Sequence, residues 1–87
     1  MGKIGEAMFY VYIIQAIEGR FYVGSTEDID KRVQQHNSKQ FKGWTNRFNN
    51  WKLVYSEQFD TRTEAIKREK QIKSMKGGKA FKMLVGS

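Results

Sequence analysis

The sequence predicts a domain of the α+β class, because strand-like and helix-like segments alternate along a short chain. Two apolar, aromatic runs, Met8–Gln15 and Phe21–Gly24, are separated by Glu18-Gly19, a favourable hairpin turn. A third run, Trp51–Phe59, alternates apolar and polar residues as a half-buried strand does. Three polar segments with helical spacing complete the order β-β-α-β-α-α.

The composition narrows the class of function. Sixteen lysines and arginines against nine aspartates and glutamates give the 87 residues a formal net charge of +7. Such an excess attracts polyanions, nucleic acid first, although general solubility or weak adhesion to an anionic membrane is the alternative. The absence of cysteine and the single His36 exclude disulfides, thiolate metal sites and a centre built on several histidines. No run approaches the ~20 apolar residues that span a bilayer and no signal peptide is visible, so we expect no membrane partner and a cytoplasmic location.

The first strands carry two tyrosines that could share a site. Residues 1–7 lack a clear period and are expected to be a flexible lead, which leaves residues 8–87 as a single domain. Met8–Gln15 is apolar almost throughout, which predicts a strand buried on both faces. Tyr12 and Tyr22 lie on the same face of the sheet only if the numbers of two residues paired across the hairpin sum to an even value. A shift of the register by one residue would move every side chain of a strand to the opposite face. Gly24 ends the second strand where a side chain would meet a ligand or a packed helix.

The first helix is predicted to begin at Ser25 or Thr26, as N-cap, and to end at about Ser38. Arg32 and His36 lie one turn apart and flank its apolar stripe. With the two tyrosines they could form a cationic, hydrogen-bonding pocket suited to a phosphate. The structural alternative is that Arg32 extends over the core and His36 is a hydrogen-bonded residue at its border.

Lys39–Asn50 has the composition of a loop, since glycine and asparagine interrupt any period. It interleaves cations with aromatic residues, an arrangement suited to phosphate contact and base stacking. The alternative is that the aromatic side chains anchor the loop to the domain. The cations expected to contact nucleic acid are Lys39, Lys42 and Arg47, and the aromatic residues are Phe41, Trp44 and Phe48.

Strand alternation and helix-capping residues predict the third strand and the two helices that follow it. Strand alternation predicts that Trp51 and Tyr55 share a face of the third strand. The next helix begins with a capping box at Thr61, runs to about Met75 and is followed by a short helix over Lys79–Val85.

Glu69 stands on the apolar stripe of the second helix, three residues after Ile66 and three before Ile72. A carboxylate at such a position is costly unless it is paired or holds a metal. Two interpretations stay open. Glu69 forms a buried salt bridge, with Arg32 as the candidate partner, or it is a ligand for Mg²⁺ or Mn²⁺, which prefer carboxylate oxygen.

Four motifs stand in order along the chain: Val11-Tyr12-Ile13, Tyr22-Val23-Gly24, Arg32 with His36, and the run from Ala65 to Lys73. In this order and spacing they resemble the GIY-YIG nuclease superfamily, in its small single-domain form related to the N-terminal catalytic domain of the nucleotide-excision-repair nuclease UvrC. The resemblance extends from roughly Met8 to Val85.

The resemblance implies a three-stranded antiparallel sheet flanked by helices, the GIY-YIG fold. It also implies a DNA endonuclease that depends on a divalent metal and acts in DNA repair or recombination. A phenol needs nearby cations to lower its pKa from about 10 before it can act as a base near neutral pH. By this resemblance, one of Tyr12 and Tyr22 acts as general base or orients the attacking water. Arg32 binds the scissile phosphate, and His36 lies near the attacking water. Glu69 binds Mg²⁺ or Mn²⁺.

The chain departs from the family pattern at two points. Val11 replaces the leading glycine of the first signature, and no asparagine follows Asn50, although many relatives carry one after the glutamate helix. Lys76 and Lys79 are the cations expected to contact nucleic acid in that region, and Lys76, Lys79 or Lys82 could compensate electrostatically for the missing asparagine. The alternative function is therefore a catalytically weak or inactive nucleic-acid-binding domain of the same fold, and a basic module for a protein partner is the third reading. DNA is the expected partner, with RNA second, and the sequence does not fix the oligomeric state.

Overall fold

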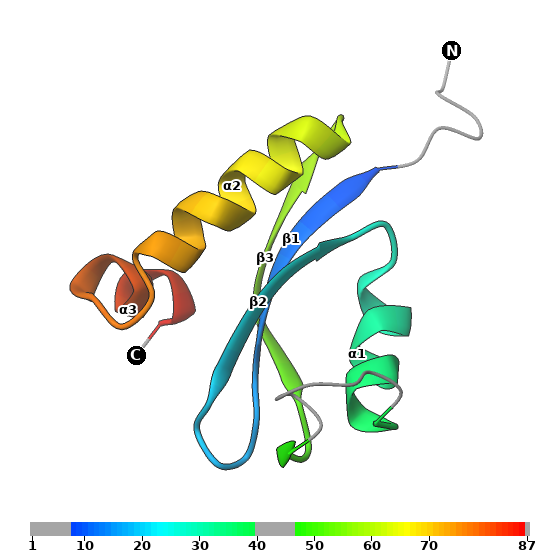
Figure 1. Cartoon of the computed structure of the whole chain (residues 1–87), viewed down its shortest axis with the longest axis vertical. Coiled ribbons are helices and arrows are strands. Elements are labelled where there is room, and N and C mark those ends of the chain that lie inside the picture. Colours follow the sequence, from blue (N-terminus) through cyan, green and yellow to red (C-terminus); the bar gives the residue numbers. More distant parts are fainter. Residues whose placement is uncertain (1–7, 40–46, 87) are drawn as a thin grey trace.

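A computed structural model of the chain describes residues 8–39 and 47–86, so the expectations for the lead and for Lys42, Phe41 and Trp44 lie outside the described residues. The elements follow the predicted order and confirm the α+β class (Figure 1). Within the described ranges, no helix combines the length and apolar character that crossing a membrane requires. The elements are β1 (Phe9–Gln15), β2 (Phe21–Thr26), α1 (Ile29–Asn37), β3 (Lys52–Phe59), α2 (Arg62–Ser74) and α3 (Lys79–Val85).

The three strands form one antiparallel sheet in the order β2-β1-β3, with α1 over one face and α2 and α3 over the other (Figure 1). Because β1 is central, it is covered on both sides, as its continuous apolar sequence predicts. Val11 and Ile13 join the core beneath α2 and α3, while Tyr12 and Ile14 join the core on the α1 side. The fold therefore has two small cores separated by one sheet.

The register of the hairpin places both signature tyrosines on the same face. Tyr12 pairs with Gly24 and Ile14 pairs with Tyr22, so the paired numbers sum to an even value. Tyr12 and Tyr22 are consequently diagonal neighbours on the α1 side of the sheet.

The alternation predicted for the third strand is wrong at one point. Ile13 pairs with Tyr55 and Ile14 with Leu53, so Val54 is an extra residue in β3. This irregularity reverses the faces that the residues before and after it present. Trp51 accordingly packs in the core on the α1 side, whereas Tyr55 packs on the α2 side.

The first helix begins later than Ser25 or Thr26, because both of those residues continue the pairing of β2 with β1. Asp28 is the N-cap instead, and its carboxylate accepts a hydrogen bond from the backbone N–H of Lys31 at 3.0 Å. The second helix begins as predicted, with the Thr61 hydroxyl as its N-cap acceptor.

Candidate active site

The centre of the candidate site is the Tyr12 side chain, which crosses from central β1 over the edge strand β2. It lies against Gly24, where a β-carbon would stand only 2.7 Å from the phenol oxygen. Glycine is therefore needed at this position for steric reasons, as the sequence suggested, but the neighbour is the Tyr12 ring and not a ligand or a packed helix. Beyond Gly24, the hydroxyl of Tyr12 is 3.1 Å from Nε2 of His36 on α1, within hydrogen-bond distance.

Three rings meet at this point. The ring centroids of Tyr22 and His36 are 4.8 Å apart, and those of Tyr12 and Tyr22 are 6.2 Å apart. Tyr12 and His36 are almost fully buried, with 1% and 3% of their surfaces exposed, whereas Tyr22 is half-buried. His36 is thus deeper than a residue at the border of the core, and Tyr22 is the phenol that solvent can reach.

Asn37 explains why the end of α1 is held so close to the sheet. Its side-chain amide donates to the carbonyl of Trp51 at 3.0 Å, and its carbonyl oxygen accepts from the N–H of Trp51 at 2.6 Å. These two hydrogen bonds join the last turn of α1 to the residue before β3 and hold His36 close to the two tyrosines. Nothing in the sequence distinguished Asn37 from an ordinary polar residue near a helix end.

Burial determines the protonation states of Tyr12 and His36. It raises the pKa of Tyr12, to which the charges of Tyr22 and Glu69 add, while the charge of Arg32 opposes the rise. Burial also lowers the pKa of His36, the positive charge of Arg32 adds to this effect, and together they bring it to about 4. Arg32 thus acts on the Tyr12 phenol in the expected direction, but burial outweighs it and the pKa is raised. Both groups are neutral near pH 7.

Arg32 and Glu69 lie on helices that cover opposite faces of the sheet, yet both act electrostatically on the Tyr12 phenol. Arg32 also lines an open hollow of about 320 Å³ to which β2, α1 and α2 contribute. Arg62, from the first turn of α2, lines the same hollow and donates to Glu27 at 3.0 Å. The sequence analysis missed Arg62, although its position seven residues before Glu69 puts both on one face of α2.

Glu69 is mostly buried, with 18% of its side chain exposed, and it pairs with Lys73 at 2.8 Å. An ion pair is thus present, but the partner that the structure describes is Lys73 and not Arg32. Ile66, expected on the inward stripe, is exposed, so the apolar face of α2 is narrower than its sequence suggests. Glu69 consequently lies at the border of that face, where a carboxylate can reach the edge of the sheet.

The donors among the described residues fit a metal ion whose shell substrate and water complete. Among residues 8–39 and 47–86 there is no cluster of three histidine or carboxylate side chains that could hold a metal. Mg²⁺, however, is commonly bound by one or two carboxylates, with substrate phosphate and water completing its shell. A single, partly exposed Glu69 fits that arrangement and does not fit a closed site made by protein alone.

The geometry can be compared with known proteins. The model of the GIY-YIG catalytic domain family matches residues 8–82. The chain belongs to the GIY-YIG family. This membership places it in a nuclease superfamily, which implies a nucleic acid substrate.

Similar GIY-YIG chains carry the label UPF0213. A UPF0213 protein of Staphylococcus saprophyticus is 40% identical over 75 residues, covering 86% of this chain and 92% of the relative. A UPF0213 protein of Staphylococcus aureus is 35% identical with the same coverage. The solution NMR structure of the UPF0213 protein BH0048 from Bacillus halodurans is 29% identical, covers 87% of this chain and 93% of that one, and has a TM-score of 0.47.

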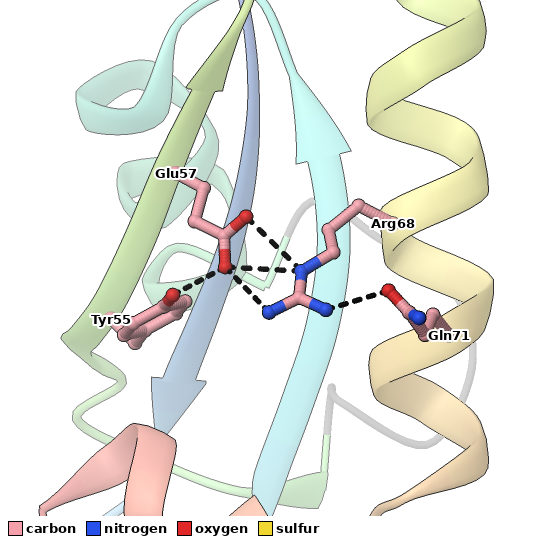
Figure 2. A network of polar contacts seen from close by, with 4 residues as sticks. All are labelled: Tyr55, Glu57, Arg68 and Gln71. Carbon is pink, nitrogen blue, oxygen red and sulfur yellow. Dashed lines mark hydrogen bonds and ion pairs between the residues drawn. The ribbon is translucent and has the colours of Figure 1, made fainter.

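A polar network that the sequence analysis missed fixes the helix bearing the GIY-YIG glutamate (Figure 2). The guanidinium of Arg68 on α2 donates to both carboxylate oxygens of Glu57 on β3, at 3.0–3.1 Å. Tyr55 donates to the same carboxylate, and Arg68 also donates to Gln71. Because Arg68 precedes Glu69, this network sets the rotation of α2 and with it the direction of the Glu69 side chain.

The cations predicted to contact nucleic acid have different surroundings in this GIY-YIG domain. Lys39 donates to the carbonyl of Phe48 at 2.6 Å and to the side chain of Asn49 at 2.8 Å, so it holds the segment before β3. Phe48 packs edge-on against Trp51, which agrees with the anchoring alternative for that ring. Arg47 and Lys79 have exposed side chains, whereas the Lys76 ammonium donates to the backbone carbonyl of Phe21 at 2.7 Å.

Proposed function

We propose that this GIY-YIG domain is a divalent-metal-dependent endonuclease that hydrolyses phosphodiester bonds in DNA, in the context of repair or recombination. The observation that supports it most is the meeting of Tyr12, Tyr22 and His36 around Gly24. Arg32 and Glu69 lie close enough for their charges to act on the same phenol. Cation, carboxylate, imidazole and phenols thus surround one edge of the sheet.

The scissile phosphate would bind in the hollow that Arg32 lines. A guanidinium is a planar, permanently charged donor that matches two phosphate oxygens at once. Hydrolysis increases the negative charge on those oxygens in the transition state, so a fixed cation at this place lowers the barrier.

Tyr22 is the phenol that we assign to the attacking water, because it is half-buried, whereas Tyr12 is 1% exposed. Tyr12 has a different role, since its hydroxyl is bonded to neutral His36. An anionic phosphate beside Arg32 offsets the positive charge that helps to lower the pKa of His36. Substrate binding would therefore make the imidazole a better acceptor for the Tyr12 proton.

Glu69 is the residue that would hold Mg²⁺ or Mn²⁺, with Lys73 balancing the carboxylate charge from the next turn. When bound, such an ion supplies Lewis-acid stabilisation of the developing phosphate charge. Glu69 fits this role because it is held on a helix whose rotation the Arg68–Glu57 contact fixes.

A second candidate function is nucleic-acid binding without turnover. The observation in its favour is that the carboxylate of Glu69 is already engaged by Lys73 at 2.8 Å. If Lys73 keeps that carboxylate, the basic surface remains but the metal ligand is lost.

One assay separates the two functions. Wild-type protein, Glu69→Gln and Glu64→Gln are incubated with supercoiled, branched and single-stranded DNA, with Mg²⁺, with Mn²⁺ or with chelator. Glu64→Gln is the matched control, because glutamine also serves in the capping box at that position. We expect metal-dependent cutting by wild type and Glu64→Gln only. Cutting by Glu69→Gln would refute the metal assignment, and binding without cutting by wild type would favour the second function.

A further inference from the structure

Four charged residues follow one another along a single face of α2 and the turn after it. Arg62, Glu69, Lys73 and Lys76 are spaced by seven, four and three residues. At 3.6 residues per turn these spacings return to the same side of a helix, so the four side chains form one stripe. The central members of the stripe are the candidate metal ligand and its ion-pair partner.

The two ends of this stripe contact the two ends of β2. Arg62 donates to Glu27, the residue after β2, at 3.0 Å. Lys76 donates to the carbonyl of Phe21, the first residue of β2, at 2.7 Å. Helix α2 therefore runs antiparallel along this edge strand, as Figure 1 shows. The hollow lined by Arg32 and Arg62 lies at one end of this pairing of α2 with β2.

A second hollow lies at the other end. It has a volume of about 510 Å³, and its charged lining residues among those the structure describes are three cations, Arg20, Lys76 and Lys82. Phe21 and Phe81 also line it, with their rings edge to face at a centroid distance of 5.1 Å. A cationic rim around an apolar floor suits a phosphate with the sugar or base attached to it.

The cations here are held close enough to repel one another. Partial burial lowers the pKa of Lys76, and the charges of Lys73 and Arg20 lower it further. Like charges gathered on one small surface are destabilising until an anion offsets them. The arrangement therefore favours a ligand with negative charge.

We propose that the pocket of Arg20, Lys76 and Lys82 binds a non-scissile phosphate of the strand whose scissile phosphate lies at Arg32. The nucleic-acid strand then runs along the edge of β2, between the two hollows. This inference rests on the proposed function, because it takes the hollow at Arg32 as the place of cleavage.

The lengths of α2 and β2 are consistent with a nucleic-acid strand that runs from one hollow to the other along β2. Fourteen residues from Arg62 to Lys76 correspond to roughly 21 Å at 1.5 Å per helical residue. Six residues from Phe21 to Glu27 correspond to roughly 20 Å at 3.3 Å per strand residue. A strand with a rise of about 3.4 Å per nucleotide would span this distance with roughly six nucleotides. Since the scissile phosphate is placed at the Arg32 end of β2, the second phosphate is roughly six nucleotides from it.

Binding without turnover tests the pocket. The affinity of a labelled 12-nucleotide single-stranded DNA is measured by fluorescence anisotropy in chelator, over a range of salt concentrations, for wild type, Lys82→Gln and Lys67→Gln. Lys82→Gln removes a pocket cation, and Lys67→Gln is the control, because Lys67 is exposed on α2 but lies off the stripe. We expect Lys82→Gln to weaken binding about tenfold and to reduce the slope of log affinity against log salt by about 1. Lys67→Gln should stay within about twofold of wild type.

A trinucleotide supplies the length control, since it is too short to reach from Arg32 to the pocket. Its affinity should be the same for wild type and Lys82→Gln. In ¹⁵N-resolved NMR spectra, the amide signals of Gly77 and Phe81 should move with the 12-mer and not with the trinucleotide.

The outcomes distinguish this inference from the function on which it rests. If wild type binds no DNA even at low salt, the proposed function fails and the pocket assignment fails with it. If wild type binds and Lys82→Gln behaves as Lys67→Gln does, the pocket assignment is overturned while the proposed function stands.

Discussion

The phenol of Tyr12 lies so close over Gly24 that a β-carbon there would stand 2.7 Å from its hydroxyl oxygen and 2.9 Å from the ring carbon that bears it. Tyr12 is almost fully buried, so its ring has little room to move away. One contact between two signature residues therefore fixes where the phenol points and which atom of His36 it meets.

We expect Gly24→Ala to destabilise the domain by about 1–3 kcal/mol, since over-packing a filled core costs roughly that amount. Urea unfolding of the variant measures the change. In a Tyr12→Leu background the same substitution should cost clearly less, because the opposing ring is gone. Equal costs in the two backgrounds would show that the ring is not what position 24 accommodates.

Stability should depend on pH through His36. Its pKa is lowered from 6.5 to about 4, so between these values the unfolded chain binds the proton more readily than the folded one. The stabilisation is fully present above pH 6.5 and is lost as the pH falls toward 4, by roughly 3 kcal/mol in total.

Urea unfolding between pH 4.5 and 6.5 measures this slope in a window above the usual range of the carboxylates. His36→Gln should flatten the slope within that window. A wild-type stability that does not change there would contradict the neutral, buried imidazole.

Arg68 should contribute more to stability than Arg62, although each donates to one glutamate. Arg68 and Glu57 have side chains only 26% and 23% exposed, while Arg62 and Glu27 are 65% and 50% exposed. Removing one partner of a half-buried pair leaves the other charge poorly solvated. We expect Arg68→Ala to cost about 2 kcal/mol and Arg62→Ala less than about 1 kcal/mol in urea unfolding. Similar losses for the two variants would argue against the network in Figure 2 as the contact that fixes α2.

Arg32→Lys should lower kcat for DNA cleavage by about a hundredfold, because lysine keeps the charge but loses the planar pair of donors. DNA affinity in chelator should change less than about threefold. Lys67→Arg, which keeps the charge at an exposed lysine outside both hollows, is the control and should leave kcat unchanged. An unaltered kcat for Arg32→Lys would mean that Arg32 acts only as a point charge.

The sequence analysis identified five of the residues that surround the candidate site, because the motifs that carry them are local. Tyr12, Tyr22, Arg32, His36 and Glu69 each stand at a spacing that a strand or a helix preserves, whatever packs around it. Asn37, Arg62 and the Arg68–Glu57 contact could not be predicted from the sequence, since each depends on a partner in another element of the fold. The raised pKa of the Tyr12 phenol could not be predicted, because burial outweighs the effect of Arg32 and the sequence does not report the depth of a side chain.

The sequence by itself determined the order of strands and helices, the basic charge and the two-sided burial of β1, since periodicity and composition act within a few residues. Only the tertiary structure decided that Val54 is an extra residue in β3, that Lys73 is the ion-pair partner of Glu69, and that a hollow with basic side chains in its lining lies at each end of β2. The physical reason is that register and helix placement come from packing between distant segments. A shift of one residue in either would send the same side chains to other neighbours.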